Sequence, residues 1–329
     1  MANTIRVEGN FENCPGDRLG YIIEKYSNFE GTIQICEHVS GNGKINADPD
    51  IPLLIFHSEG DTKYIDVKKL QKYGTVLHCN YKWKHGKYFN YWAYDYLNRI
   101  DNYKIDLNTK NSFSEKFLCL NGRPDWHRYA TLQFLVNTGL YEKGLISFLD
   151  RYGQFSNEIA YEKFVHKFPG NKEFITDLYQ NQECIILDRS NEQIHKNDRS
   201  HDEYIYKDTS ISLVTETYGD AKRGTFITEK SWKPIANSHF QIWIAQPGIV
   251  QAFRDFGFDM FDDFLDNSYD YVVDDISRFE HAVDSLNIAL CNIKQLTGTK
   301  KTELQKRLND NQKKYLAMTI SEEEIKGWL

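Results

Sequence analysis

The chain alternates short apolar runs with amphipathic segments in two series, and this alternation predicts its secondary structure. In the first series the apolar runs have the length of β-strands, at residues 4–8, 32–39, 51–57 and 75–80. The amphipathic segments predicted as helices are 17–29, 67–73 and 87–99. Strands that alternate with helices are typical of βαβ units, so this pattern predicts a largely parallel sheet.

The pattern starts again after a polar, aperiodic stretch at residues 100–112, which is predicted to be a linker. The predicted strands of this second series are 116–121, 145–149, 184–187, 211–217 and 240–245. Its predicted helices are 125–138, 228–237, 248–256 and a long one from 275 to about 296. The long helix has one apolar face, formed by Phe279, Val283, Leu286, Leu290 and Ile293.

Two consecutive α/β series predict an α/β protein with two Rossmann-like domains that face a cleft. We expect an N-terminal domain at 1–108, a second domain at 109–300 and a helical tail at 301–329. The tail is charged, and its helices are expected to pack back across the domains. Ligands of such sheets bind at the carboxyl ends of the strands, so functional residues are sought there.

Composition narrows the class of protein. The chain has 329 residues, 40% of them hydrophobic and 26% charged, which excludes a disordered protein. A net charge of −7 argues against unselective binding to nucleic acid or anionic membranes. No segment approaches the roughly 20 apolar residues of a membrane span, and residues 1–9 have no features of a secretory signal. The six cysteines are widely spaced, which favours reduced thiols in a cytoplasmic protein.

The segment F-I-T-E-K, residues 226–230, has the chemistry that a nucleotide requires. Thr228 is placed to cap a helix that starts at Glu229, and Lys230 falls in its first turn. Free N–H groups and a cation at a helix N-terminus suit a pyrophosphate, while Glu229 can accept hydrogen bonds from ribose hydroxyls. The alternative is an ordinary helix start, with a threonine cap and an acidic first turn.

The context of this segment resembles a known family. A strand ending in Glu216, a short loop with glycines, F-I-T-E-K, an apolar helix and another strand resemble the donor-binding segment of α1,3-fucosyltransferases and related GT-B glycosyltransferases, including phage members. The resemblance implies that Glu229 binds the nucleotide ribose, that Lys230 binds the phosphates, and that Glu216 lies near the sugar.

Two further features bear on this resemblance. The later segments G-F-D-M-F (257–261) and S-Y-D (268–270) are similar to those that follow in phage relatives. The loop between Glu216 and Phe226 departs from the family pattern, because it carries Lys222 and Arg223. Arg223 is therefore an additional candidate for contact with the donor.

A second segment, F-L-C-L-N-G-R-P-D-W-H-R (117–128), is similar to the one that opens the donor domain of the same families. There an arginine in the first helical turns reaches the diphosphate. Arg128 matches that arginine best, and Arg123 is close behind. A guanidinium beside helix N-termini can neutralise a leaving diphosphate in a bidentate way. The alternative is that both arginines only solvate the start of a helix.

The general base is expected in the N-terminal domain. A buried-looking strand at 51–57 is followed by Glu59 and Asp61, where a sheet presents functional groups. Either carboxylate can take the proton of an acceptor hydroxyl. A solvated turn with acids and glycine is an equally good interpretation. Asp95, within an aromatic helix, is a weaker candidate.

Together these features predict a cytoplasmic glycosyltransferase that uses a UDP- or GDP-linked sugar as co-substrate. No cofactor or metal is required if Arg128 and Lys230 supply the positive charge, and the sequence has no metal-binding motif. A glycan acceptor is favoured. The basic aromatic segment 81–88 (Y-K-W-K-H-G-K-Y) instead suits modified DNA, such as hydroxymethylated pyrimidines of a phage genome. An inactive nucleotide-binding module is the third possibility.

Overall fold

The computed structural model describes residues 3–6, 18–37, 48–57, 70–72, 74–82, 86–103, 105, 107, 112–150, 158–187, 203–220 and 224–329. The chain forms two compact units. Unit 1 comprises Met1–Lys104, Arg223–Glu229 and Leu316–Leu329, and unit 2 comprises Ile105–Lys222 and Lys230–Tyr315. Both units contain a parallel sheet with helices, so the α/β class predicted from the sequence is confirmed.

The main sheet of unit 1 has the strand order β1-β2-β3-β4-β6, and all its neighbouring strands are parallel. These strands are β1 (Asn3–Arg6), β2 (Thr32–Glu37), β3 (Leu53–His57), β4 (Thr75–His78) and β6 (Lys87–Tyr88). The helices in the described part of unit 1 are α1 (Arg18–Tyr26), α3 (Tyr91–Tyr103) and α13 (Glu322–Trp328). The helix predicted at 87–99 is wrong in its first turn, since Lys87 and Tyr88 pair with β4 instead. Most of the predicted helix 67–73 lies outside the described residues.

Segments distant in sequence complete the core of unit 1. The short strand β10 (Thr225–Phe226) pairs antiparallel with β5 (Asn80–Tyr81). The Phe89 ring is fully buried between Tyr94, on which it stacks, and Trp328 of α13. Next to α13, the Tyr94 hydroxyl donates a 3.0 Å hydrogen bond to the carbonyl oxygen of Thr319. Residues from the beginning, middle and end of the chain therefore share one core.

The sheet of unit 2 has four parallel strands in the order β11-β9-β7-β8. They are β7 (Phe117–Asn121), β8 (Gly144–Phe148), β9 (Ile211–Thr215) and β11 (Phe240–Ile244). All lie within one or two residues of predicted strands. The predicted strand 184–187 does not form: Ile185 makes a single antiparallel bridge to Phe148.

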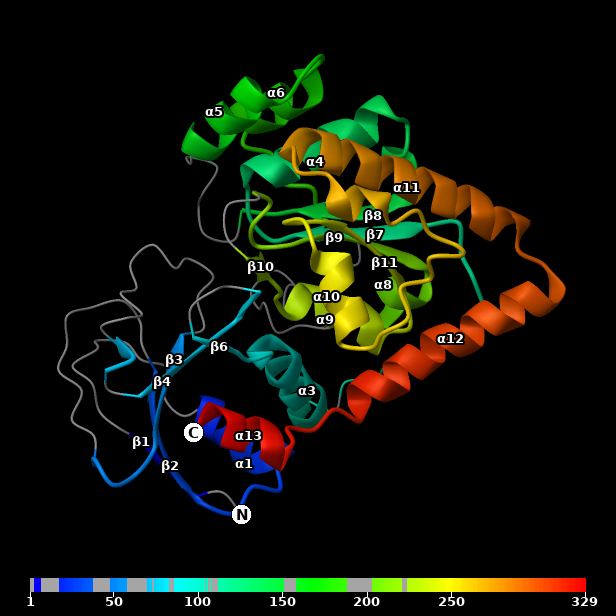
Figure 1. Ribbon diagram of the computed structural model, residues 1–329. Coiled ribbons are helices and arrows are strands. Elements are labelled where there is room, and N and C mark those ends of the chain that lie inside the picture. Colours follow the sequence, from blue (N-terminus) through cyan, green and yellow to red (C-terminus); the bar gives the residue numbers. More distant parts are fainter. Residues whose placement is uncertain are drawn as a thin grey trace. The chain divides into compact units, whose positions relative to one another are not determined.

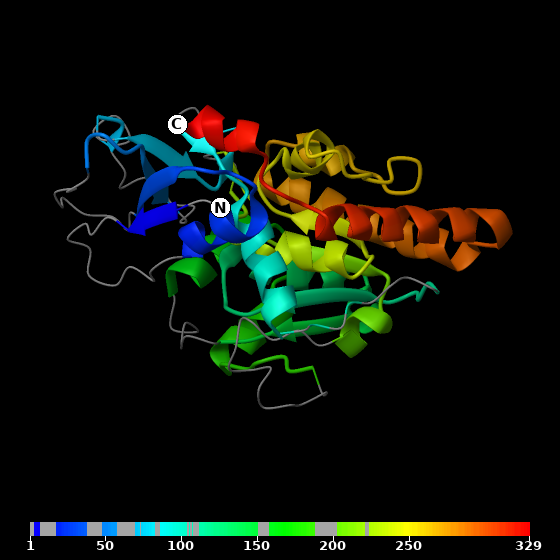
Figure 2. The same cartoon turned by 90° about the horizontal axis from the view of Figure 1, so that it is seen from below.

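Helices cover both faces of this sheet (Figure 1), with α4 and α11 over one face and α9 and α10 over the other. Their bounds are α4 (Trp126–Asn137), α9 (Glu229–Ala236), α10 (Ile249–Asp255) and α11 (Asp275–Gln295). The five apolar residues predicted to form one face of α11 are all buried. After α11 comes α12 (Gly298–Leu316), the long orange-red helix of Figure 2.

Between β8 and β9 the described residues form three helices that the sequence pattern did not predict: α5 (Glu158–Lys167), α6 (Glu173–Gln180) and α8 (Glu203–Lys207). Two 3₁₀ turns complete the described elements, η2 (Tyr141–Lys143) and η4 (Ser268–Tyr271). Both α5 and α6 pack against α4. Their aromatic side chains meet that helix in one cluster, in which the rings of Tyr161 and Tyr179 stack 3.8 Å apart over Tyr129.

Candidate functional site

The strand order of unit 2 creates a topological switch point between β7 and β9. From β7 the chain passes through α4 to β8 on one side, whereas β9 and then β11 lie on the other side. Right-handed crossovers in opposite directions place α4 and α9 on opposite faces, so the loops diverge at the carboxyl ends of β7 and β9. Such a divergence is where open α/β sheets bind their ligands.

Arg128 connects the two loops at this switch point. It is the third residue of α4, and its side chain is buried, with 2% exposed. Its Nη1 donates to the carbonyl oxygen of Arg123 at 3.1 Å, and its Nη2 donates to that of Glu216 at 3.4 Å. Its Nε has no hydrogen-bond partner among the described residues. Burial lowers the pKa of Arg128 to about 10, so the group stays a cation at neutral pH.

His127 also bonds to the end of β9. Its Nε2 lies 2.8 Å from the Glu216 carbonyl oxygen, so this nitrogen carries the proton and donates it. Burial lowers the pKa of His127 to about 4, so the imidazole is neutral at physiological pH. A neutral histidine and a charged arginine therefore hold the same carbonyl group.

The Glu216 side chain is fully buried and turned toward α9. Its carboxylate accepts a 2.6 Å hydrogen bond from the Ser231 hydroxyl and a 3.1 Å bond from the Thr217 backbone N–H. In the first turn of α9, the Lys230 Nζ donates to the Thr217 hydroxyl at 3.4 Å. Unit 2 thus brings together Arg128, Glu216 and Lys230, three of the residues singled out from the sequence.

Buried polar groups continue beneath the switch point. The Asn121 side chain accepts a 2.7 Å hydrogen bond from the Thr215 hydroxyl on β9 and donates one of 3.2 Å to the Ser147 carbonyl oxygen on β8. Sequence reasoning missed Asn121 and Ser231. The available signal was weak: Asn121 is a polar residue that ends an otherwise apolar strand.

The loop after β9 is held in place from several elements. Arg278 of α11 is buried and donates to the carbonyl oxygens of Gly219 at 2.7 Å and Ala245 at 2.8 Å. Lys163 of α5 donates a 2.7 Å hydrogen bond to Asp220. Sequence reasoning missed both cations, because each acts on a loop far away in the chain. The contacts hold the main chain of this loop at Gly219 and the side chain of Asp220.

The other predicted donor residues have different positions. Thr228 is buried and Glu229 half-buried, and both belong to the segment of unit 1 that leads into α9. Arg123 is half-buried, and its contact with Arg128 uses its backbone carbonyl oxygen. The predicted residues Glu59, Asp61 and Arg223 lie outside the described residues.

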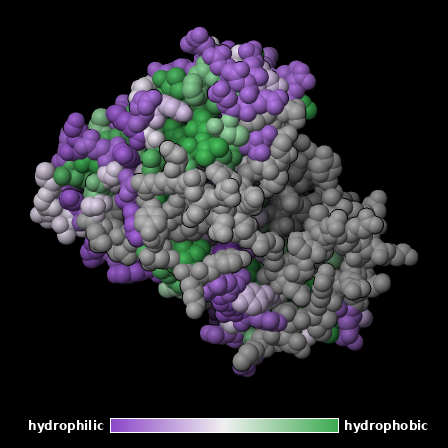
Figure 3. Space-filling model, turned by 180° about the vertical axis from the view of Figure 1, so that it is seen from behind, coloured by the Kyte–Doolittle hydropathy of each residue, from purple (hydrophilic) through white to green (hydrophobic). Residues whose placement is uncertain are grey.

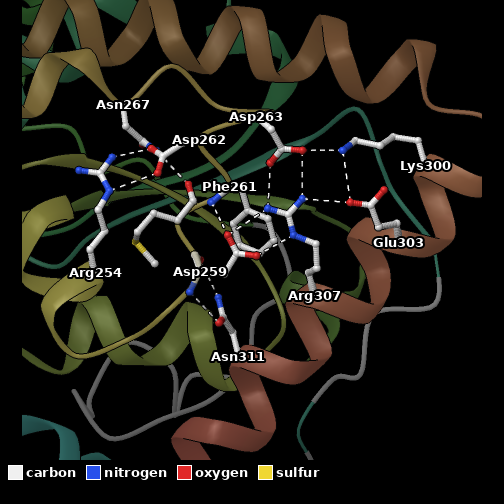
Figure 4. A network of polar contacts seen from close by, with 11 residues as sticks. Arg254, Asp259, Phe261, Asp262, Asp263, Asn267, Lys300, Glu303, Arg307 and Asn311 are labelled. Carbon is white, nitrogen blue, oxygen red and sulfur yellow. Dashed lines mark hydrogen bonds and ion pairs between the residues drawn. The ribbon is translucent and has the colours of Figure 1, made fainter.

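The carboxylates of Asp259, Asp262 and Asp263 form ion pairs with cations (Figure 4). Arg254 binds the Asp262 carboxylate, and Arg307 of α12 binds both Asp259 and Asp263. Lys300 binds Asp263 as well. Within the described ranges, no group of three or more His, Cys, Asp or Glu side chains has the arrangement to hold a metal ion.

The basic aromatic segment of unit 1 is described only at its ends, since Trp83, Lys84 and His85 lie outside the described residues. The rings of Tyr81 and Tyr88 meet edge to face with centroids 5.4 Å apart. The Lys82 ammonium lies 5.1 Å from the centroid of the Tyr81 ring. At these ends, the aromatic rings pack on each other.

No protein-family model, curated protein or solved structure matches this chain in the comparisons. Among the described helices, none combines the length and the apolar character needed to cross a membrane. On the face seen in Figure 3, both hydrophilic and hydrophobic residues appear among the coloured atoms.

Proposed function

We propose that the protein is a glycosyltransferase of GT-B type that moves a sugar from a nucleotide-sugar donor to a hydroxyl group, with a glycan as the favoured acceptor. Unit 2 would bind the nucleoside diphosphate and unit 1 the acceptor. The observation that carries this proposal is the meeting of Arg128, Glu216 and Lys230 at the switch point between β7 and β9.

Two cations at this point support a diphosphate as the ligand. The buried Arg128 keeps its Nε without a partner among the described residues, and an unpaired donor of this kind is costly unless a ligand satisfies it. Lys230 lies in the first turn of α9, where the helix dipole adds positive potential. An anion that carries two negative charges matches this arrangement of charges.

The same groups suit the chemistry of glycosyl transfer. Negative charge grows on the diphosphate as the bond to the sugar breaks, so fixed cations stabilise the transition state more than the ground state. A carboxylate of unit 1, with Glu59 and Asp61 as the predicted candidates, would take the proton of the attacking hydroxyl. This would complete a transfer in which the chain's own side chains supply the acid-base and electrostatic groups.

Isothermal titration with UDP, GDP and their sugars tests the donor site directly. We expect one nucleoside diphosphate to bind with a Kd in the micromolar range, which corresponds to about 8 kcal/mol. Lys230→Ala should weaken that binding about tenfold. Lys313→Ala is the matched control: Lys313 is 77% exposed on α12, and its substitution removes the same charge. Absence of binding by any nucleoside diphosphate or nucleotide sugar would overturn the proposal.

The ribose contact has its own test. Glu229→Gln should lower the affinity for the ribonucleotide about tenfold, because an amide accepts hydrogen bonds from the ribose hydroxyls less strongly than a carboxylate. The affinity for the 2′,3′-dideoxy analogue should not change. Equal losses of affinity for the two ligands would show that Glu229 does not bind the ribose hydroxyls.

A further inference from the structure

A chain of buried hydrogen bonds connects β11 to β9 through the first turn of α9. The indole N–H of Trp243 donates to the Ser231 hydroxyl at 2.9 Å, and that hydroxyl donates to the Glu216 carboxylate at 2.6 Å. The Ser231 carbonyl oxygen in turn accepts a hydrogen bond from the Gln241 side chain. All four residues are buried. Both the hydroxyl and the carbonyl oxygen of Ser231 thus accept hydrogen bonds from side chains of β11.

Glu216 uses both carboxylate oxygens within the protein. One oxygen accepts from Ser231 and the other from the Thr217 N–H, and no part of the side chain is exposed. A buried carboxylate needs such hydrogen bonds to offset the loss of water. With both oxygens bonded inward, the group is arranged to hold structure together rather than to bind a sugar hydroxyl.

We propose that Glu216 is a positioning residue that acts through Ser231 to fix the first turn of α9. The proposal rests on the proposed function, because the group that it places is Lys230, next to Ser231. Thr217 adds a second connection, since its N–H bonds to Glu216 and its hydroxyl accepts from Lys230. Two hydrogen bonds from the end of β9 therefore place Lys230. Glu216 holds the neighbouring Ser231, and the Thr217 hydroxyl holds the Lys230 ammonium itself.

Three variants test this role by their kinetics. Ser231→Ala breaks the chain at its centre and should raise the KM for the donor about tenfold, with kcat changed less than about threefold. Trp243→Phe removes only the indole N–H bond and should raise KM in the same direction by a smaller factor. Glu216→Gln keeps one oxygen that can accept from Ser231 but loses the acceptor for the Thr217 N–H, so KM should rise by a smaller factor than in Ser231→Ala.

The double variant Ser231→Ala/Trp243→Phe tests whether the hydrogen bonds of Ser231 and Trp243 act as one connected series or as two independent contributions. Because both substitutions act on the same hydroxyl, the double variant should have the KM of Ser231→Ala alone. Ser285→Ala is the matched control. Ser285 is buried in unit 2 on α11, and its hydroxyl has no hydrogen-bond partner in the described part of the chain. This control should not change KM.

Two results would overturn the positioning role. One is a loss of kcat of about 100-fold in Glu216→Gln with normal kinetics in Ser231→Ala, which would make Glu216 a group that contacts the reacting sugar. The other is an unchanged rate of amide hydrogen exchange in the first turn of α9 when Ser231 is replaced. The exchange experiment needs no substrate, so it decides the positioning role even if the protein binds no nucleotide.

Discussion

Tyr315, at the end of α12, stacks on Trp232 of α9 with 5.2 Å between the ring centroids. Both side chains are fully buried. One turn before Tyr315 on α12, Gln312 donates a hydrogen bond to the carbonyl oxygen of Ala236, the last residue of α9. The helix that carries Lys230 at its start is thus supported along its far side by α12.

Removing this stacked ring should destabilise the protein. Tyr315→Ala leaves a cavity beside Trp232, and we expect the free energy of unfolding to fall by about 3 kcal/mol. Chemical denaturation followed by tryptophan fluorescence measures this loss. Leu316→Ala, at a neighbouring position that is 42% exposed, should cost well under half as much. Similar losses in both variants would show that the stack contributes little.

The ion pairs of Arg307 should make stability depend on pH. The hydrogen bond from Arg307 holds the pKa of Asp263 below its ordinary value of 3.8. Because the folded-state pKa is the lower one, the ion pair stabilises the fold above about pH 4, and this contribution is lost as the pH falls through the folded-state pKa. Arg307→Ala should therefore cost about 1 kcal/mol at neutral pH and progressively less below about pH 4.

Urea unfolding of the wild type and Arg307→Ala across this pH range provides the measurement. The cost should also shrink in about 1 M salt, because the carboxylates are partly exposed and screened. Lys306→Ala serves as the control, since Lys306 is 77% exposed and its ion pair among the described residues is with Asp310. A cost for Arg307→Ala that is constant with pH would assign its effect to packing on Phe261.

Gly219 should tolerate no side chain. A Cβ at this position would lie 2.7 Å from the His127 Cβ and 2.9 Å from the Phe279 Cζ. Gly219→Ala should lower the free energy of unfolding by about 1–3 kcal/mol and displace the loop that follows Glu216. Gly327→Ala, in α13 with open space around it, should instead stabilise slightly. Thermal unfolding of the two variants in parallel checks this difference in sign.

Arg128→Lys tests the planar guanidinium. Lysine keeps the charge but cannot donate to the carbonyl groups of Arg123 and Glu216 while also facing a phosphate. We expect kcat/KM to fall by about 100-fold. Arg254→Lys, in an exposed ion pair with Asp262, should leave the kinetics unchanged. Normal kinetics in Arg128→Lys would assign the charge of the leaving group to other residues.

The sequence predicted the strands β7, β8, β9 and β11 well because they are buried and appear as apolar runs. It missed the helices α5, α6 and α8 of the same unit. The ends of those runs also located Glu216 and the start of α4. Local patterns carried no information on contacts between distant segments, so the bonds from Trp243 to Ser231 and from Arg278 to Gly219 were missed. The order of the strands, which makes β7 and β9 the switch point, had no local signal either.

In unit 1, too, a contact between distant segments could not be predicted from local sequence patterns. The two-residue strands β5 and β10 are too short for a hydrophobic period, and their pairing joins Asn80 to Phe226 across nearly half of the chain. The segment 184–187, which belongs to unit 2, shows the opposite error. Its apolar residues are typical of a strand, but Ile185 alone pairs with the sheet, at the edge strand β8.

The three-segment composition of unit 1 has a consequence for synthesis on the ribosome. The bond from Tyr94 to Thr319 spans 225 positions, and the Phe89 ring packs on Trp328. The strands and main helices of unit 2, from β7 to α12, are complete before α13 emerges. Unit 1 is therefore begun first and finished last. All strands of its main sheet are present once Tyr88 has been added, but β5 lacks its partner β10 and the core lacks α13 until later. Contact with a chaperone would protect the exposed core surface during that interval.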